Sequence, residues 1–72
     1  MNFQLRGEFI GLDALLKATG LAPSGGAAKA MVDAGEVRVD GAIETRRRAK
    51  LRAGQQVQVG AQRIVVIAAS AD

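Results

Sequence analysis

Two kinds of apolar spacing divide the chain into a helical first half and an alternating second half. In the first half, side chains suited to one helix face recur every three or four residues, at Leu12, Leu15, Leu16 and Thr19. This spacing predicts a helix over residues 12–19, with Asp13 in the first turn, where a carboxylate suits the helix dipole. Gly20 follows, and glycine readily adopts the left-handed conformation that ends many helices.

A second helix is expected after Pro23. Ser24 is a typical N-cap residue, because its hydroxyl accepts a hydrogen bond from an amide of the first helical turn. The apolar face consists of Ala28, Met31 and Val32, and Gly35 is expected to end the helix. Two helices joined by such a short turn form a helical hairpin.

Alternating positions predict strands after the second helix. Residues 37–39 and 43–45 alternate on either side of Asp40-Gly41, a strong signal for a turn between strands. Residues 57–59 form a further alternating segment after a turn at Ala53-Gly54. These segments predict an antiparallel arrangement, since short turns join them.

The two ends of the chain add to this pattern. Residues 64–67 are four consecutive β-branched residues and predict a strand covered on both faces. Residues 2–6 alternate and predict a short strand or extended arm, whereas residues 68–72 are expected to form a frayed tail. Together the elements predict an α+β fold, a two-helix hairpin followed by a small antiparallel β-sheet. We expect a single domain, residues 1–72, with its core at about residues 9–67.

The composition argues against catalysis and metal binding. The chain has no histidine and no cysteine, which removes the usual general base and the commonest metal ligands. Its acidic residues are scattered and form no paired acid–base constellation. We therefore expect no enzymatic activity, no metal and no cofactor. No apolar run approaches the roughly 20 residues of a membrane span and no signal peptide is recognisable, so a cytoplasmic protein without membrane contact is expected.

Positive charge is concentrated in one segment, residues 46–52. The basic members of this segment are Arg46, Arg47, Arg48, Lys50 and Arg52. The whole chain has 10 basic and 7 acidic residues, for a net charge of +3, so the other 65 residues carry 5 basic and 7 acidic groups. A focused positive patch is typical of a protein that binds a polyanion, most commonly nucleic-acid phosphate. The alternative is a solvated strand or loop that protects a sheet edge, although one or two charges suffice for that.

The start of the second helix is a further candidate site. Gly25 and Gly26 follow Ser24, and Lys29 lies about one turn further along. Bare amides at a helix N-terminus accept an anion, and glycine lets a ligand's backbone approach closely. The alternative is a loose helix start, in which the glycines only make the bend after Pro23. The spacing from glycine to lysine differs from that of a nucleotide-binding P-loop.

The order of these residues resembles the RNA-binding domain named after small-subunit ribosomal protein four, also called the alpha-L motif. The resemblance extends over about residues 11–59 and rests on Leu12-Asp13, Gly20-Leu21, Ser24, Ala28-Lys29, Val32, Gly35, Val37, Val39-Asp40-Gly41 and Ala53-Gly54-Gln55-Gln56-Val57. Two stretches, Ser24-Gly25-Gly26 and Glu44-Thr45-Arg46-Arg47-Arg48, are most similar to the small stand-alone bacterial members, the YbcJ-like proteins. The resemblance implies two packed helices leading into a small sheet, and binding of structured RNA.

The resemblance also implies an RNA-contacting face. It would include Ser24, Gly25 and Gly26 at the start of the second helix, and Lys29 at a position that is usually basic. The strand and turn near Arg38 would border this face.

Four positions depart from the family pattern. Gly11 stands where the family usually has arginine, and Gly25 replaces a common arginine. Glu36 replaces a frequent histidine and Asp40 a frequent asparagine. We expect the basic segment, residues 46–52, to replace the lost donors as an anchor.

These observations favour a non-catalytic, stand-alone RNA-binding module for structured or double-stranded RNA, with ribosomal or transfer RNA as the expected classes and the ribosome as a candidate partner. Arg46, Arg47, Arg48 and Lys50 would hold phosphates. The chain has two Phe and no Trp or Tyr, which favours phosphate contacts and groove shape over base stacking. A monomer is expected. The alternatives are a protein-interaction adaptor that docks an acidic partner or a ribosomal surface, and an accessory subunit of an RNA-modifying enzyme.

Overall fold

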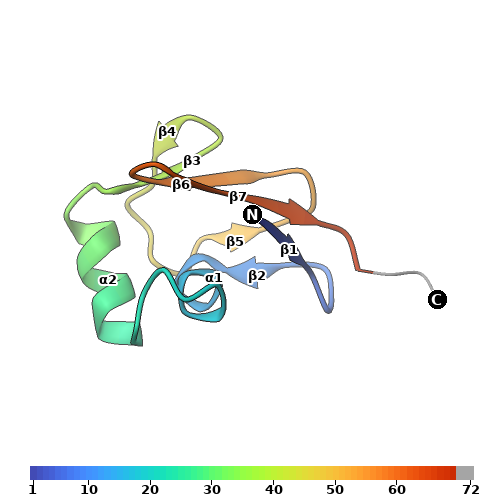
Figure 1. Cartoon of the computed structure of the whole chain (residues 1–72), viewed down its shortest axis with the longest axis horizontal. Helices are drawn as coiled ribbons and strands as arrows, with labels where there is room; N and C mark the ends of the chain where they lie inside the picture. Colours follow the sequence, from blue (N-terminus) through green and yellow to red (C-terminus); the bar gives the residue numbers. More distant parts are fainter. Residues whose placement is uncertain (70–72) are drawn as a thin grey trace.

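The computed structural model describes residues 1–69 and places two helices and a two-stranded ribbon on one side of a five-stranded sheet (Figure 1). The elements follow one another as β1 (Asn2–Gln4), β2 (Ile10–Gly11), α1 (Leu12–Ala18), α2 (Gly25–Asp33), β3 (Val37–Val39), β4 (Ala42–Ile43), β5 (Lys50–Leu51), β6 (Gln56–Val59) and β7 (Gln62–Ile67). The predicted α+β class, with a helical hairpin ahead of a small sheet, is confirmed.

Both helices begin and end where the sequence predicts. Ser24 caps α2, since its Oγ accepts a hydrogen bond of 3.1 Å from the amide of Ala27. Helix α1 ends at its C-cap Thr19, and Gly20 follows with a φ of 80°. Gly35 follows α2 with a φ of 75°. Both glycines occupy the left-handed region, which costs glycine little and other residues more.

The five-stranded sheet has the order β1-β7-β6-β3-β4. Strands β3, β4, β6 and β7 pair antiparallel as predicted, whereas β1 adds to the edge of β7 in parallel and makes the sheet mixed. The predicted strand near the N-terminus is confirmed, and its side chains alternate, with Leu5 buried and Gln4 exposed. The alternation of a segment shows which side chains face the core, but it carries no information on the direction of the neighbouring strand.

Two details of the predicted strands are wrong. The segment of residues 64–67 is covered on one face, not on both, because Ile64 and Val66 are fully buried while Ile67 is 38% exposed. The helices and the ribbon lie on one side of the sheet, so the opposite face stays open to solvent (Figure 1). Strand β4 ends at Ile43 and does not reach residue 45. One more ladder bond, from the amide of Glu44 to the oxygen of Val37, precedes the departure of the chain into a loop.

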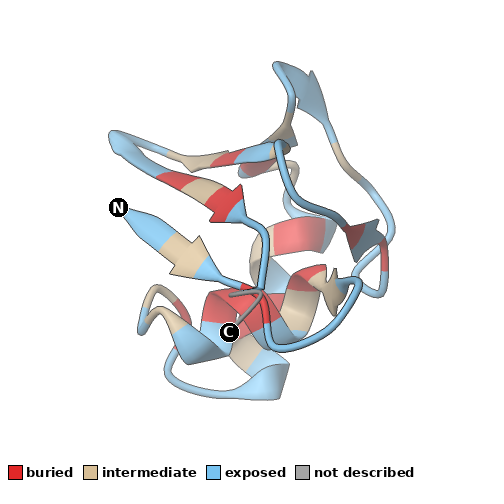
Figure 2. Ribbon diagram, turned by 90° about the vertical axis from the view of Figure 1, so that its right-hand side faces the viewer, coloured by how far each residue is buried: buried red, intermediate tan, exposed pale blue. Residues whose placement is uncertain are grey.

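The core fills the space between the sheet and the helices, and Figure 2 shows its buried residues on both layers. Its largest fully buried side chains are Leu12, Leu15, Leu16, Val32, Val37, Leu51, Val57, Ile64 and Val66. Burying each such side chain contributes about 1.5–3 kcal/mol relative to leaving it exposed. In the predicted tail of residues 68–72, Ala68 and Ala69 are exposed and belong to no strand, and residues 70–72 lie outside the described residues.

Candidate functional site

The basic segment, residues 46–52, lies in the β4–β5 loop and in β5. Arg46, Arg47 and Arg48 are exposed in the loop, which Figure 1 draws in yellow. Lys50 is exposed in β5, next to the buried Leu51. Arg46, Arg48 and Lys50 line one shallow hollow of the surface. All five basic residues predicted for this segment, Arg52 included, are therefore exposed.

The main chain of the β4–β5 loop is fixed by the first turn of α1. The amide of Leu12 donates a hydrogen bond of 2.9 Å to the oxygen of Ala49, and the amide of Asp13 donates one of 2.8 Å to the oxygen of Arg47. The first amides of a helix have no partner within the helix, and Gly11 at the N-cap offers no side chain to accept from them. Ala49 is buried, so the loop is held by its backbone and its arginine side chains stay outside.

Glu44 fixes the start of the same loop. Its Oε2 accepts hydrogen bonds from the amides of Thr45, at 2.9 Å, and Arg46, at 3.1 Å. The guanidinium of Arg46 forms an ion pair with Glu44 at 3.3 Å, in which the glutamate side chain is 16% exposed and the arginine side chain 77%. The side-chain hydrogen bond from Arg46 lowers the pKa of Glu44, and the same bond raises the pKa of Arg46. Arg46 is thus partly neutralised, whereas no such ion pair forms with Arg47 or Arg48 among the described residues.

The ribbon of β2 and β5 carries the rest of the segment. Gly11 pairs directly with Lys50, and Ile10 pairs with Leu51. Position 11, where the family usually carries arginine, therefore lies opposite a lysine on the neighbouring strand. A Cβ at Gly11 would lie 3.0 Å from Oδ1 of Asp13, so a larger residue there requires the Asp13 side chain to shift.

The start of α2 is open. Gly25 and Gly26 are exposed, and a Cβ built on either residue meets no atom closer than 3.9 Å. Neither glycine has a positive φ. Neither the backbone conformation nor the internal packing therefore requires glycine at these two positions. This favours the interpretation that the glycines leave room for something outside the chain.

Lys17 is a cation near this helix start that the sequence analysis did not single out. Its Cδ lies 4.0 Å from the position of a Cβ on Gly25. Lys17 belongs to the last turn of α1, and the hairpin brings it beside the first turn of α2. Lys29, four residues after Gly25, is exposed on the neighbouring turn of α2. Only the packing of the two helices reveals the neighbour, since eight residues separate Lys17 from Gly25.

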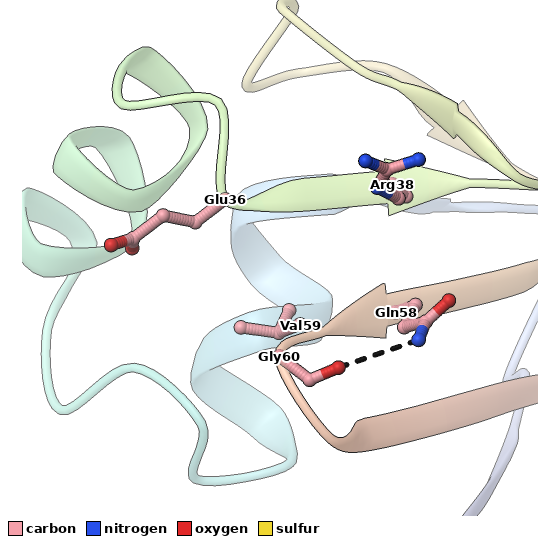
Figure 3. A pocket seen from close by; sticks show the side chains of 5 residues that line it. All are labelled: Glu36, Arg38, Gln58, Val59 and Gly60. Atoms are coloured by element: carbon pink, nitrogen blue, oxygen red, sulfur yellow. Dashed lines mark hydrogen bonds between the residues drawn. The ribbon is translucent and has the colours of Figure 1, made fainter.

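The structure separates Arg38 from the other predicted residues. Arg38 lies on the open face of the sheet, paired across strands with Gln58 and Ile43. It lines a hollow with Glu36, Gln58 and the end of β6, and Figure 3 shows the Glu36 carboxylate directed away from Arg38. The start of α2 lies at the end of that helix remote from the sheet (Figure 1). The predicted residues thus form three separate groups: the β4–β5 segment, the start of α2, and Arg38.

Asp40 has a structural task in the β3–β4 turn. It adopts a φ of 52°, the left-handed region that Asp and Asn tolerate better than most residues. Its Oδ1 accepts a hydrogen bond of 2.9 Å from the amide of Gln56, and its Oδ2 accepts one of 3.2 Å from Nε2 of Gln55. Oε1 of Gln55 in turn accepts from the amide of Arg52 at 2.8 Å. This chain of contacts ties the turn to the end of the basic segment.

Residues 1–69 contain neither a metal-binding cluster nor a membrane-spanning helix. No group of three or more acidic, histidine or cysteine side chains is placed to hold a metal ion in that range. Within the same residues, no helix has the length and apolar character needed to cross a membrane.

Comparison with known proteins gives a consistent result. The S4 domain family model matches residues 3–67. The YbcJ proteins of Escherichia coli (strain K12) and Shigella flexneri are each 46% identical over 54 residues, which cover 75% of this chain and 77% of each relative. The solution structure of E. coli YbcJ, whose description names an alfaL motif involved in RNA-binding, matches with a TM-score of 0.71 at 40% identity, over 92% of this chain and 85% of that chain. The family resemblance seen in the sequence is confirmed.

Proposed function

Because the chain belongs to the S4 domain family, we propose that it is a non-catalytic module that binds structured or double-stranded RNA. Ribosomal and transfer RNA are the classes with the compact, paired structure that such a module would grip, and the ribosome is a candidate partner. The related YbcJ structure, described as containing a motif involved in RNA-binding, supports the assignment of RNA as the ligand.

The observation that carries the proposal is the fixed main chain of the β4–β5 loop. Its carbonyls at Arg47 and Ala49 cap α1, so the loop keeps one path while its arginine side chains point to solvent. Arginine presents a planar fork of donors that matches a phosphate group. A backbone ordered in advance lowers the entropy cost of binding, because only the side chains lose freedom.

The start of α2 would supply a second contact with the RNA backbone. Exposed amides at a helix N-terminus attract phosphate, and the two glycines leave them accessible. Lys17 and Lys29 add positive charge near this opening. A-form RNA is recognised mainly through its shape, its phosphates and its 2′-hydroxyls, which suits a surface with several cations and few aromatic side chains.

The proposal is tested by titrating the full chain against a fluorescent RNA duplex and a DNA duplex of the same sequence at several salt concentrations. We expect tighter binding to RNA. We also expect the logarithm of the affinity to fall against the logarithm of salt with a slope of about −4, the value for four to five phosphate contacts. Equal binding to RNA and DNA would contradict RNA recognition. Absence of binding to both at physiological salt would favour an acidic protein as the partner.

A further inference from the structure

An exposed aromatic ring lies beside the basic segment, on the outward face of the β2–β5 ribbon. Phe9 directly precedes β2, and its side chain is 45% exposed. Nζ of Lys50 lies 4.9 Å from the centroid of the ring, and Cζ of Arg52 lies 5.9 Å from it. Leu51, between the two cations, is buried. Alternation from Lys50 through Leu51 to Arg52, the residue that directly follows β5, therefore explains why both cations lie on the side that Phe9 occupies.

Most phenylalanine side chains are buried in the core, whereas Phe9 is exposed. The other ring, Phe3, is packed against the core, as expected for a large apolar side chain. Phe9 keeps nearly half of its surface open even though the neighbouring Ile10 contacts the core. In the free chain, cation–π attraction holds the two positive groups over the ring, and they must move off a ring face toward phosphates before a base can stack on it. An apolar ring and two positive charges thus lie together, a combination typical of proteins that bind unpaired nucleotides.

We propose that Phe9 stacks on an unpaired base of the bound RNA while Lys50 and Arg52 hold the phosphates on either side of that nucleotide. The inference rests on the proposed function and narrows its ligand to RNA in which a duplex is interrupted by a bulged or unpaired nucleotide. In a continuous duplex every base is stacked on its neighbours, so only an unpaired or terminal base offers a free face to Phe9. The low aromatic content of the sequence argues against stacking, but a single well-placed ring is sufficient for one nucleotide.

The test compares two RNA duplexes of the same sequence, one of which carries a single bulged adenine, with the ends of both closed by the same non-nucleotide linkers so that no terminal base pair is free for stacking. Affinities are measured for the unchanged chain, for Phe9→Leu and for Ile43→Ala. Leucine keeps an apolar side chain of similar size at position 9 and removes the aromatic face. Ile43 is a matched control, because it is also a large exposed apolar residue, at 52% exposure, and lies on strand β4 of the other sheet. Thermal melts establish that each variant is folded.

We expect the unchanged chain to prefer the bulged duplex. Phe9→Leu should lose affinity for it by a factor within the range of about 5- to 150-fold that alanine substitution of a stacking aromatic residue causes. Phe9→Leu should bind the continuous duplex as tightly as the unchanged chain does. Phe9→Tyr should retain the preference for the bulged duplex. Ile43→Ala should bind both duplexes like the unchanged chain. A 2-aminopurine placed in the bulge should be quenched by the unchanged chain and not by Phe9→Leu.

Equal affinity of the unchanged chain for both duplexes, with no effect of Phe9→Leu, would overturn the stacking inference and leave the proposed function standing. Failure of the unchanged chain to bind either RNA would contradict the proposed function itself. An equal loss of affinity for both duplexes in folded Phe9→Leu would show that the ring only positions Lys50 and Arg52, and would also overturn the inference.

Discussion

The main-chain oxygen of Arg47 accepts a hydrogen bond of 2.8 Å from the amide of Asp13, the second residue of α1. The contact serves both partners. The helix gains an acceptor for an amide that the N-cap Gly11 leaves without a side-chain partner, and the loop gains a fixed path. Because the backbone of Arg47 makes this contact, its side chain is available for a ligand.

Removing two of these arginine side chains should weaken RNA binding without weakening the fold. In Arg47→Gln/Arg48→Gln the main-chain contacts with α1 are retained, so the melting temperature should change little. The slope of log affinity against log salt should become shallower by about 2, one for each lost phosphate contact. Titrations of a duplex RNA at several salt concentrations measure this slope.

Arg6→Gln/Arg63→Gln is the matched control, since it removes the same charge from two exposed arginines outside the basic segment. An equal change of slope in this control would show that binding depends on the net charge and not on the β4–β5 loop.

Glu44 should stabilise the fold and oppose RNA binding. The pKa of its carboxyl is lowered by hydrogen bonds with the Arg46 side chain and with the main-chain amides of Arg46 and Thr45. Its contribution to stability is therefore complete above the ordinary pKa of 4.5 and is lost as the pH falls from there through the lowered pKa of the folded state. Glu44→Gln should lower the melting temperature at pH 7 by about 4–8 °C, equivalent to about 1 kcal/mol in a domain of this size.

Melts at pH 7 and at several pH values below 4.5 check the sign, because the difference between the unchanged chain and Glu44→Gln should narrow as the pH falls and the carboxyl takes up a proton. The same variant should bind duplex RNA more tightly at pH 7, since one negative charge beside the arginines is removed. Glu8→Gln is the control, because Glu8 is exposed and has no hydrogen-bond partner among the described side-chain contacts. A similar pH dependence in Glu8→Gln would contradict the role assigned to Glu44.

Replacing the glycines at the start of α2 should change the stability of the fold and the affinity for RNA in opposite directions. The space around both is open, and alanine is a better helix former than glycine by roughly 1 kcal/mol per residue in a helix interior. Gly25→Ala/Gly26→Ala should therefore raise the melting temperature by at most about 8–16 °C, the equivalent of about 2 kcal/mol. If RNA approaches the amides closely, the two methyl groups should lower its affinity. Unchanged affinity together with higher stability would indicate that the glycines only ease the bend after Pro23.

Asp40 should stabilise the fold through the contacts of its carboxylate in the β3–β4 turn. Asp40→Asn keeps an acceptor and a residue that tolerates positive φ, so we expect a change of less than about 1 kcal/mol. Asp40→Ala loses the contacts with Gln55 and Gln56 and strains the backbone, which should cost about 1–3 kcal/mol. Urea denaturation of both variants measures the difference. Equal stability of the two variants would mean that the turn does not depend on this carboxylate.

The elements with local signals could be predicted from the amino-acid sequence. Leucines at helical spacing, a serine cap and two glycines define the helical hairpin, and alternation with Asp40-Gly41 defines the hairpin of strands. Each of these features depends on residues at most four positions apart, so it can be predicted from the order of amino acids along the chain. The concentration of charge in residues 46–52 is equally local, and the family resemblance followed from the order of the same short motifs.

The contacts between these elements could not be predicted in the same way. The parallel pairing of β1 with β7, the capping of α1 by the β4–β5 loop, and the approach of Lys17 to Gly25 join segments whose sequences carry no mark of one another. Phe9 shows the same limit, because nothing in its local sequence distinguishes an exposed ring beside two cations from a core residue. Such contacts arise when apolar faces from distant segments are buried together. Their positions depend on the free energy of the whole core and cannot be derived from any single segment.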